Sequence, residues 1–226
     1  MTIKPLLASP LNLALALCLA CAPAFAADRD IDKVNGAITV EAGERMGNLE
    51  TVNGSINVGA SARVASAETV NGSIKVGDKA RTGGLETVNG SIRVGEAVYM
   101  GGDVGTVNGS IFIDRGGEVR GAVETVNGAI GLVDTDVSGG IETLNGDLTV
   151  GAGSHVRGGI LYRKARRQLI SLKARTPRVV IGPNARVDGP LVFEREVKLY
   201  VHSSATSGPV TGATAVTYEG ARAPQD

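Results

Sequence analysis

Histidines and acidic residues are the side chains in this sequence that could carry acid–base chemistry. The chain has two histidines, His155 and His202, and neither has an acidic residue close to it in the sequence. Acyl transfer needs a basic histidine beside the acyl donor, and sugar cleavage needs a pair of carboxylates. Aromatic residues that could hold a sugar are few: 3 Phe, 4 Tyr and no Trp. We therefore interpret His155 as a turn residue, and we expect no enzyme, no catalytic residue and no cofactor.

Acidic residues recur one repeat apart, with one gap between Glu86 and Glu124. Glutamates precede the repeated Asn-Gly motif at Glu50, Glu68, Glu86, Glu124 and Glu142. A column of carboxylates could bind calcium, but calcium-binding solenoids use the spacing Gly-Gly-x-Gly-x-Asp. That spacing does not occur in this sequence. We interpret the column as a solvated row of charge and expect no metal site.

Basic residues are concentrated in the C-terminal third of the chain. Nine Lys and Arg residues and no acidic residue lie between Leu148 and Val187. Such a patch could contact lipopolysaccharide, lipid headgroups or an acidic partner, although a solvated loop would have the same composition. Nucleic acid is not expected, because only Tyr162 among the aromatic residues accompanies the basic run. The candidate contacts are Arg163, Lys164, Arg166, Arg167, Lys173, Arg175 and Arg178.

The N-terminal segment 1–26 is typical of an export signal. Lys4 is followed by an apolar run over 11–22, and the Ala-Phe-Ala sequence at 24–26 precedes an acidic residue. The run is shorter than the ~20 apolar residues that span a bilayer, so we expect no transmembrane span. We predict cleavage after Ala26 and location in the periplasm or at the cell surface. The mature chain would have 22 basic and 23 acidic residues, a net charge of −1.

Both cysteines of the chain, Cys18 and Cys21, lie inside this signal. The mature chain therefore has no thiol or disulfide, and its stability must come from backbone ladders and packing. An alternative is a lipoprotein, in which a cysteine near the end of the signal is the lipid-modified first residue.

An internal repeat indicates the fold. The Asn-Gly pair begins at residues separated by 18 or 19 positions, namely Asn35, Asn53, Asn71, Asn89, Asn108, Asn127 and Asn145. A hairpin meander does not need such a constant step, whereas a solenoid has one copy per coil. We therefore predict an all-β protein, a single β-solenoid of about 18-residue coils, with Asn-Gly at a corner where the asparagines hydrogen-bond along the stack.

Alternation within one copy predicts which side chains face the core. In the copy from residue 87 to 94, we expect Val88, Gly90, Ile92 and Val94 to point inward. The residues between them, Thr and Asn included, would then form outward rows along the rod. The handedness of the coil stays open, because this long alternating strand favours a right-handed coil and apolar residues six apart favour a left-handed one.

The repeat changes after residue 160. The segment 161–178 breaks the period, and the pattern returns in looser form over 179–219. We predict the following division of the chain: 1–26 signal peptide, 27–160 regular solenoid coils, 161–178 basic insertion, 179–219 irregular C-terminal coils, 220–226 tail.

The repeated Val-Asn-Gly-Ser-Ile-x-Val units over 34–160 resemble the adhesin-like β-solenoid repeats of bacteria. The Gly-rich aliphatic coils are also similar to bactofilins, which are polymer-forming cytoskeletal proteins. Both resemblances imply a β-solenoid, and neither supplies a catalytic residue. Bactofilins are largely cytoplasmic, so the export signal favours the first resemblance.

These observations predict a non-enzymatic structural or interaction protein of the bacterial cell envelope, adhesin-like or a scaffold. Its partner would be another copy of the chain, an envelope glycan or lipid, or a protein. One alternative is a bactofilin-like filament protein. A less favoured one is a hexapeptide-type acyltransferase, whose coils have a similar length and apolar residues six apart, as at Val52, Val58 and Val64.

Overall fold

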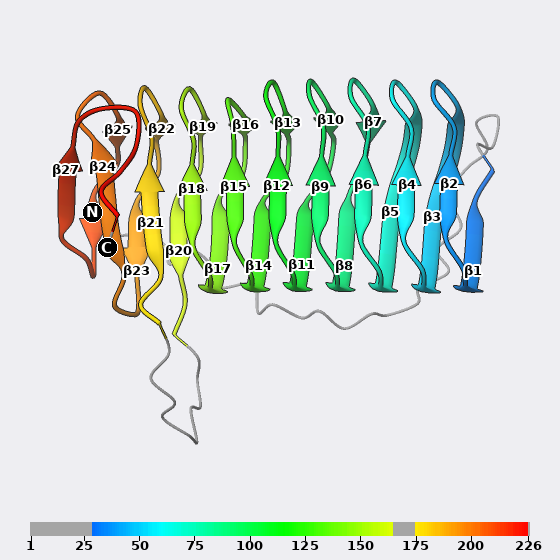
Figure 1. Ribbon diagram of the computed structural model, residues 1–226, viewed down its shortest axis with the longest axis horizontal. Helices are drawn as coiled ribbons and strands as arrows, with labels where there is room; N and C mark the ends of the chain where they lie inside the picture. Colours follow the sequence, from blue (N-terminus) through cyan, green and yellow to red (C-terminus); the bar gives the residue numbers. More distant parts are fainter. Residues whose placement is uncertain (1–28, 165–174, 226) are drawn as a thin grey trace, which may run out of the picture.

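The computed structural model describes residues 29–164 and 175–225 of the chain. These residues form 27 β-strands and no helix, and the strands build one elongated β-solenoid of about 10 turns spaced about 18 residues apart (Figure 1). The predicted fold class is therefore confirmed. No helix in the described part of the chain is long and apolar enough to cross a membrane. The predicted signal, with Cys18 and Cys21, lies outside the described residues.

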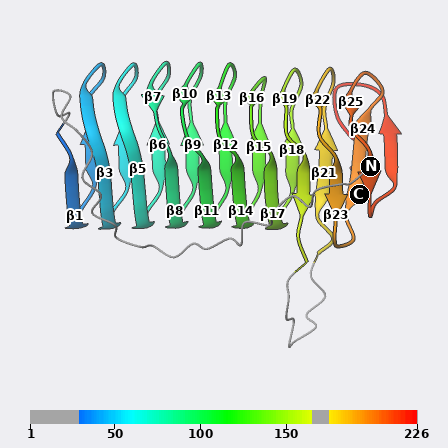
Figure 2. The same ribbon diagram turned by 180° about the vertical axis from the view of Figure 1, so that it is seen from behind.

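Each regular coil has three short strands, so the rod has three faces. One coil contains β7 (Arg81–Thr82) on what we call the third face, β8 (Leu85–Asn89) on the first face and β9 (Ile92–Val94) on the second face. All strand pairs are parallel, and the register joins residues 18 or 19 apart through most of the rod, as in Thr87↔Thr106 and Ile92↔Ile111. Seen from behind, the strands follow one another along the rod in the same order (Figure 2).

The first and third faces belong to one 17-stranded sheet, because two long strands continue from the third face onto the first. These two strands are β3 (Arg45–Asn53) and β5 (Arg63–Asn71). The other strands of the first face are β1 (Ile31–Asn35), β8 (Leu85–Asn89), β11 (Val104–Asn108), β14 (Val123–Asn127), β17 (Ile141–Asn145), β20 (Ile160–Tyr162), β23 (Leu191–Phe193) and β26 (Val210–Thr211). Those of the third face are β7 (Arg81–Thr82), β10 (Tyr99–Met100), β13 (Glu118–Val119), β16 (Asp136–Val137), β19 (His155–Val156), β22 (Arg186–Val187) and β25 (Thr206–Ser207).

The second face is a separate 10-stranded sheet. Its strands are β2 (Ile38–Val40), β4 (Ile56–Val58), β6 (Ile74–Val76), β9 (Ile92–Val94), β12 (Ile111–Ile113), β15 (Ile130–Leu132), β18 (Leu148–Val150), β21 (Arg178–Ile181), β24 (Lys198–His202) and β27 (Ala215–Tyr218).

The core is a set of aliphatic rows that run the length of the rod. In one coil, Leu85 comes from the first face, Ile92 and Val94 from the second, and Val98 and Met100 border the third, and all five are buried. The same positions are apolar in neighbouring coils, so the side chains stack at the strand spacing of about 4.8 Å. A single coil could not bury these residues, and the stacking supplies the core.

The predicted orientation was wrong for the first half of the motif. Thr87 is buried and only 2% exposed, whereas Val88 is partly exposed and lies on the outer surface. Thr87 and Ile92 are five positions apart and both point inward, which strict alternation does not allow. The reason is the corner between β8 and β9, which interrupts the alternation and lets it restart at Ile92. The inward prediction for Ile92 and Val94 is confirmed.

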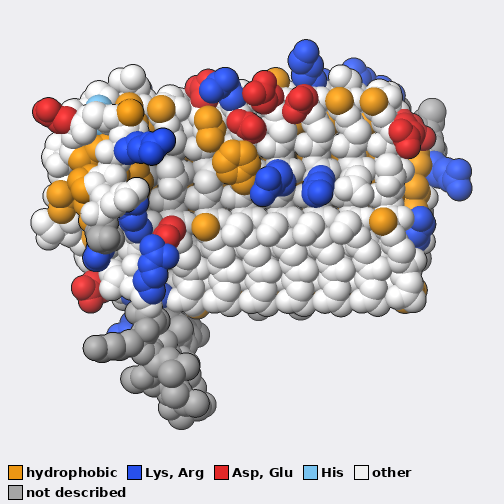
Figure 3. All heavy atoms as spheres, in the orientation of Figure 1, with side chains coloured by type: hydrophobic (Ala, Val, Ile, Leu, Met, Phe, Trp, Pro, Cys, Tyr) orange, Lys and Arg blue, Asp and Glu red, His pale blue; other side chains and the backbone are white. Residues whose placement is uncertain are grey.

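The Asn-Gly pair forms this corner, as predicted. The asparagines make six links along the stack, in which Nδ2 of each one donates to Oδ1 of the one before at 2.9–3.1 Å. The following glycine is needed because coils approach closely: a Cβ atom at Gly90 would lie 1.9 Å from the carbonyl oxygen of Gly72. Figure 3 shows a regular array of uncharged groups along the lower part of the rod, below the charged groups.

The solenoid continues on both sides of the interruption. Tyr162 is in β20 and Arg178 begins β21, so both ends of the segment 161–178 belong to coils. Register then joins residues 31 apart, as in Leu148↔Val179, and the last coils have steps of 20 and 16 residues. Tyr162 occupies the position of the repeated threonine, where its hydroxyl donates to the Gly146 carbonyl at 3.0 Å. Burial raises the pKa of this phenol well above its usual range.

Candidate functional site

The outward residues of the third face form one continuous row of mostly charged side chains. Parallel in-register pairing brings residues one repeat apart in the sequence to neighbouring positions about 4.8 Å apart. The row is basic toward the N-terminal end, acidic in the middle, and contains a histidine and an arginine toward the C-terminal end. We call it the third-face row, and its members are Arg45, Arg63, Arg81, Tyr99, Glu118, Asp136, His155, Arg186 and Thr206.

Three arginines at the start of the row lie in a shallow groove of about 360 Å³. Arg45, Arg63 and Arg81 are exposed and in register, and none of them forms an ion pair with a carboxylate in residues 29–164 or 175–225. Tyr99 follows these arginines in the row, with its ring 5.2 Å from the guanidinium carbon of Arg81. We call these four residues the arginine groove. Small side chains leave the space: Ala65 and Gly83 line it beside the arginines.

The arginine groove has the chemistry of an anion site. A guanidinium group pairs with a carboxylate or phosphate through two parallel hydrogen bonds. Three such groups at the strand spacing repel one another, and a bound anion would relieve this repulsion. Sequence reasoning missed this site, although the signal was present, because Arg45, Arg63, Arg81 and Tyr99 follow one another at the constant step of the repeat.

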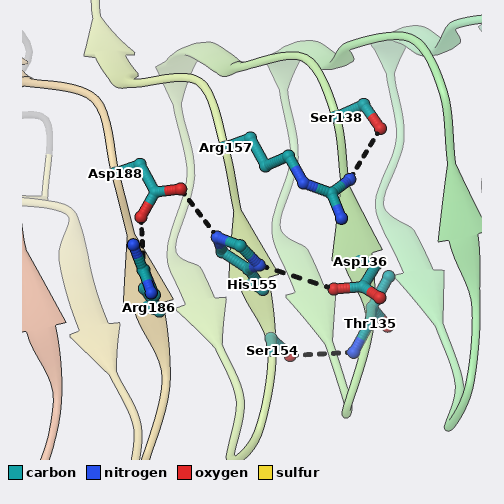
Figure 4. Close-up of polar contacts among 8 residues, drawn as sticks. All are labelled: Thr135, Asp136, Ser138, Ser154, His155, Arg157, Arg186 and Asp188. Atoms are coloured by element: carbon teal, nitrogen blue, oxygen red, sulfur yellow. Dashed lines mark hydrogen bonds and ion pairs between the residues drawn. The ribbon is translucent and has the colours of Figure 1, made fainter.

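A second polar cluster lies further along the row, around His155 (Figure 4). Nε2 of His155 is 2.8 Å from Oδ2 of Asp188, and Nδ1 is 3.9 Å from Oδ1 of Asp136. The other oxygen of Asp188 accepts a hydrogen bond from Arg186. The hydrogen bonds from His155 and Arg186 hold the pKa of Asp188 below its usual range. The cluster therefore links three successive coils through an alternating chain of acidic and basic groups.

The interpretation of His155 as a turn residue was wrong, because it lies in strand β19. Asp188 is 33 residues away from His155 in the sequence, because the interruption of the repeat lies between their two coils. The two coils are nevertheless neighbours in the rod, so the side chains meet. Next to this cluster, Nη1 of Arg157 donates to Oγ of Ser138 at 3.0 Å. The second histidine, His202, contacts Ser204 and packs edge-on against the ring of Tyr218.

The seven predicted basic contacts have different outcomes. Arg166, Arg167 and Lys173 lie outside the described residues, and the backbone amide of Lys164 donates to Glu194 at 3.0 Å. The other three use their side chains within the protein. Arg163 pairs with Glu142, Arg175 pairs with Asp147 at 3.1 Å, and Arg178 packs over the ring of Tyr200.

These contacts attach the two ends of the interrupted segment to the rod. Asp147 also accepts the backbone amide of Arg178 at 2.8 Å. Arg195, from the following coil, donates to Oδ1 of Asn145 and to the Leu144 carbonyl, and so caps the asparagine ladder. The described arginines of the segment thus have structural partners, unlike Arg45 and Arg63.

The glutamate column lies on the first face, where Glu86 is exposed and the other four glutamates are partly buried. Gly105 interrupts it between Glu86 and Glu124, which border a hollow of about 90 Å³. Burial raises the pKa of Glu124, and the neighbouring carboxylate of Glu142 raises it further. No group of three or more His, Cys, Asp or Glu side chains in the described part of the chain could hold a metal ion.

Comparison with known proteins gives no relative from which a function could be transferred. The sequence matches no protein-family model, no curated protein and no solved structure. A function must therefore be inferred from the fold and from the surfaces described above.

Proposed function

We propose that this protein is a non-enzymatic structural or interaction protein of the bacterial cell envelope, adhesin-like or a scaffold. The observation that carries the proposal is the arginine groove, in which three arginines in register, Arg45, Arg63 and Arg81, have no carboxylate partner among the described residues. Four other arginines are each paired with a carboxylate, namely Arg120, Arg163, Arg175 and Arg186. Like charges in neighbouring coils destabilise the rod, so their presence is best explained by a partner that neutralises them.

The rod itself suits a binding or spacing role. The buried threonines, the asparagine ladder and the aliphatic rows stabilise contacts between coils, and the outward rows remain available to a partner. The predicted export signal favours a partner in the envelope.

The proposal is tested by producing the full chain in a bacterium and separating the cell fractions. We expect the protein in the envelope or periplasmic fraction, with a mass that corresponds to loss of the segment 1–26. The purified protein should also sediment with isolated envelope fragments. A protein that keeps its N-terminus and stays in the cytoplasmic fraction would contradict the proposal.

A second candidate is a filament-forming scaffold, and one observation favours it. Within the described residues, the first strands β1 and β2 each pair with a single neighbour, so their other edges are open, and Val34 of β1 is 65% exposed. Open strand edges promote association with a further strand. Electron microscopy and light scattering over a range of protein concentrations test this candidate: lengthening filaments would support it, and a monodisperse short rod would exclude it.

A further inference from the structure

The arginine groove differs from the other charged surfaces of the rod in three ways. Its guanidinium groups repeat at the same position in consecutive coils, they lack carboxylate partners among the described residues, and they lie along the rod axis. Elsewhere in the third-face row, Arg186 is paired with Asp188. Beside the row, Arg120 is paired with Glu118. Three successive guanidinium groups without a carboxylate partner among the described residues thus lie side by side at one end of the third face.

The geometry of the groove defines the shape of its ligand. A ligand that meets all three arginines must be extended, must run along the rod and must carry negative charge at regular intervals. Met46 and Val64 add apolar surface to the lining, and Tyr99 adds a hydroxyl. Such a mixed lining suits sugar rings, which have apolar faces and polar edges.

We infer that the arginine groove binds a linear carboxylated polysaccharide, with its carboxylates paired to Arg45, Arg63 and Arg81. This inference rests on the proposed function and names the partner class. A carboxylate is planar and accepts the two parallel hydrogen bonds that a guanidinium group donates.

Two other polyanions fit less well. Single-stranded nucleic acid is bound by stacking its bases on aromatic rings, and the one ring in this groove, Tyr99, already lies between Arg81 and Arg120. An anionic membrane would contact a broad area of the face. The row continues into Glu118 and Asp136, which the headgroups would repel.

The test is calorimetric titration of the full chain with oligogalacturonate, and with the same oligosaccharide after methyl esterification of its carboxylates. We expect binding of the free acid that weakens with added salt, and no binding of the ester. Replacement of the central arginine, Arg63→Gln, should weaken binding about tenfold, as expected for the loss of one hydrogen-bonded charge. Arg63→Lys should restore only part of the affinity, because an ammonium group lacks the planar fork.

The matched control is Arg93→Gln, which removes the same charge from an exposed position on the second face. It should leave the affinity unchanged. No variant should unfold at a lower temperature than the wild type, and Arg63→Gln should unfold at a slightly higher one, because it removes the repulsion between the arginines. Equal weakening by Arg93→Gln and Arg63→Gln, or equal binding of the ester, would overturn the inference. Tighter binding of single-stranded DNA or of anionic lipid vesicles would also overturn it.

The same variants separate this inference from the proposed function. If wild type and Arg63→Gln sediment equally well with envelope fragments, the groove is not the contact, yet the envelope role stands. If neither the wild type nor any variant reaches or binds the envelope, the proposed function itself fails.

Discussion

The repeated threonine acts inside the rod. Thr51, Thr69, Thr87, Thr106 and Thr125 are buried, and each hydroxyl donates to a glycine carbonyl of the preceding coil at 2.8–3.3 Å. The valine that follows each threonine lies at the outer surface, where Val52 is 40% exposed. The repeated threonine is a polar residue that would be expected at the surface, but it is part of the contact between coils.

An exchange of isosteric residues tests this assignment. Thr87→Val should lower the free energy of unfolding by about 1 kcal/mol, because the partly buried carbonyl of Gly72 loses its hydroxyl donor. Val88→Thr should change it by less than about 0.5 kcal/mol, because position 88 is at the surface. Chemical denaturation of both variants measures the difference. A larger loss for Val88→Thr would mean that the strand faces are reversed.

The glutamate column predicts a dependence of stability on pH. Burial raises the pKa of Glu68 above its ordinary 4.5, and Glu86 and Glu50 raise it further. The folded protein therefore holds this proton more tightly than the unfolded chain, and stability falls as the pH rises above about 4.5 through the raised pKa. Glu68→Gln should stabilise the protein at pH 7 by at most about 1 kcal/mol, since the side chain is partly solvated.

The gain from Glu68→Gln should disappear when unfolding is measured below pH 4.5, where the glutamate is neutral in both states. Glu96→Gln, at an exposed position in the turn after β9, is the matched control and should have little effect at either pH. An unchanged gain at low pH would show that the effect is not electrostatic.

The candidate sites differ in how far the sequence could reveal them. The arginine groove was readable, because its members stand one repeat apart and the pairing brings such residues together. The contact between His155 and Asp188 could not be predicted from the sequence, because the length of the interrupted segment determines which residue pairs with β19. The pairing of Arg163 with Glu142 was likewise hidden, since it depends on where the regular coils stop.

At the scale of the strand and its corner, the repeat predicted the coil and its turn but not the side-chain phase. The constant step and the Asn-Gly corner were both readable from the sequence. The sequence did not reveal which side chains of the first face point inward. The corner interrupts the alternation, and Thr and Val have the same branched shape, so either could occupy the inward position. In the structure, the burial of Thr87 and the hydrogen bond from its hydroxyl to the Gly72 carbonyl distinguish the two orientations.

Gly90 at the corner and Gly105 on the first face should behave in opposite ways. Gly90→Ala should cost about 3 kcal/mol, because the new Cβ would lie 1.9 Å from a backbone oxygen of the preceding coil. Gly105→Ala should instead stabilise the protein by about 0.5 kcal/mol, because no atom lies within 4 Å of its Cβ position and alanine restricts the unfolded chain. Thermal and chemical unfolding of both variants checks this, and equal costs would contradict the close approach at the corner.

For the whole molecule, stability is distributed along one dimension. Each coil contacts mainly the coils before and after it, so a defect should spread only to its neighbours. Ile38 and Ile92 are equally buried on the second face, but Ile38 belongs to the first coil and Ile92 to the interior of the rod.

A buried charge at these two positions should therefore have different consequences. Ile92→Asp should cost more than about 4 kcal/mol and remove cooperative unfolding, because the carboxylate has no partner in the core. Ile38→Asp should release only the first coil and leave most of the β-sheet signal intact. Circular dichroism and amide hydrogen exchange compare the two variants, and global unfolding of Ile38→Asp would argue against independent terminal coils.

The asparagine ladder and the backbone bonds between coils all run parallel to the rod axis. A mechanical force applied to the two ends of the chain would therefore load only the outermost coil, and the coils would detach in sequence. Each detachment of about 18 residues would lengthen the chain by roughly 60 Å at full extension. Over the regular coils, the rod would thus respond to tension by a series of small and nearly equal extensions, and it would resist compression along its axis through its stacked core.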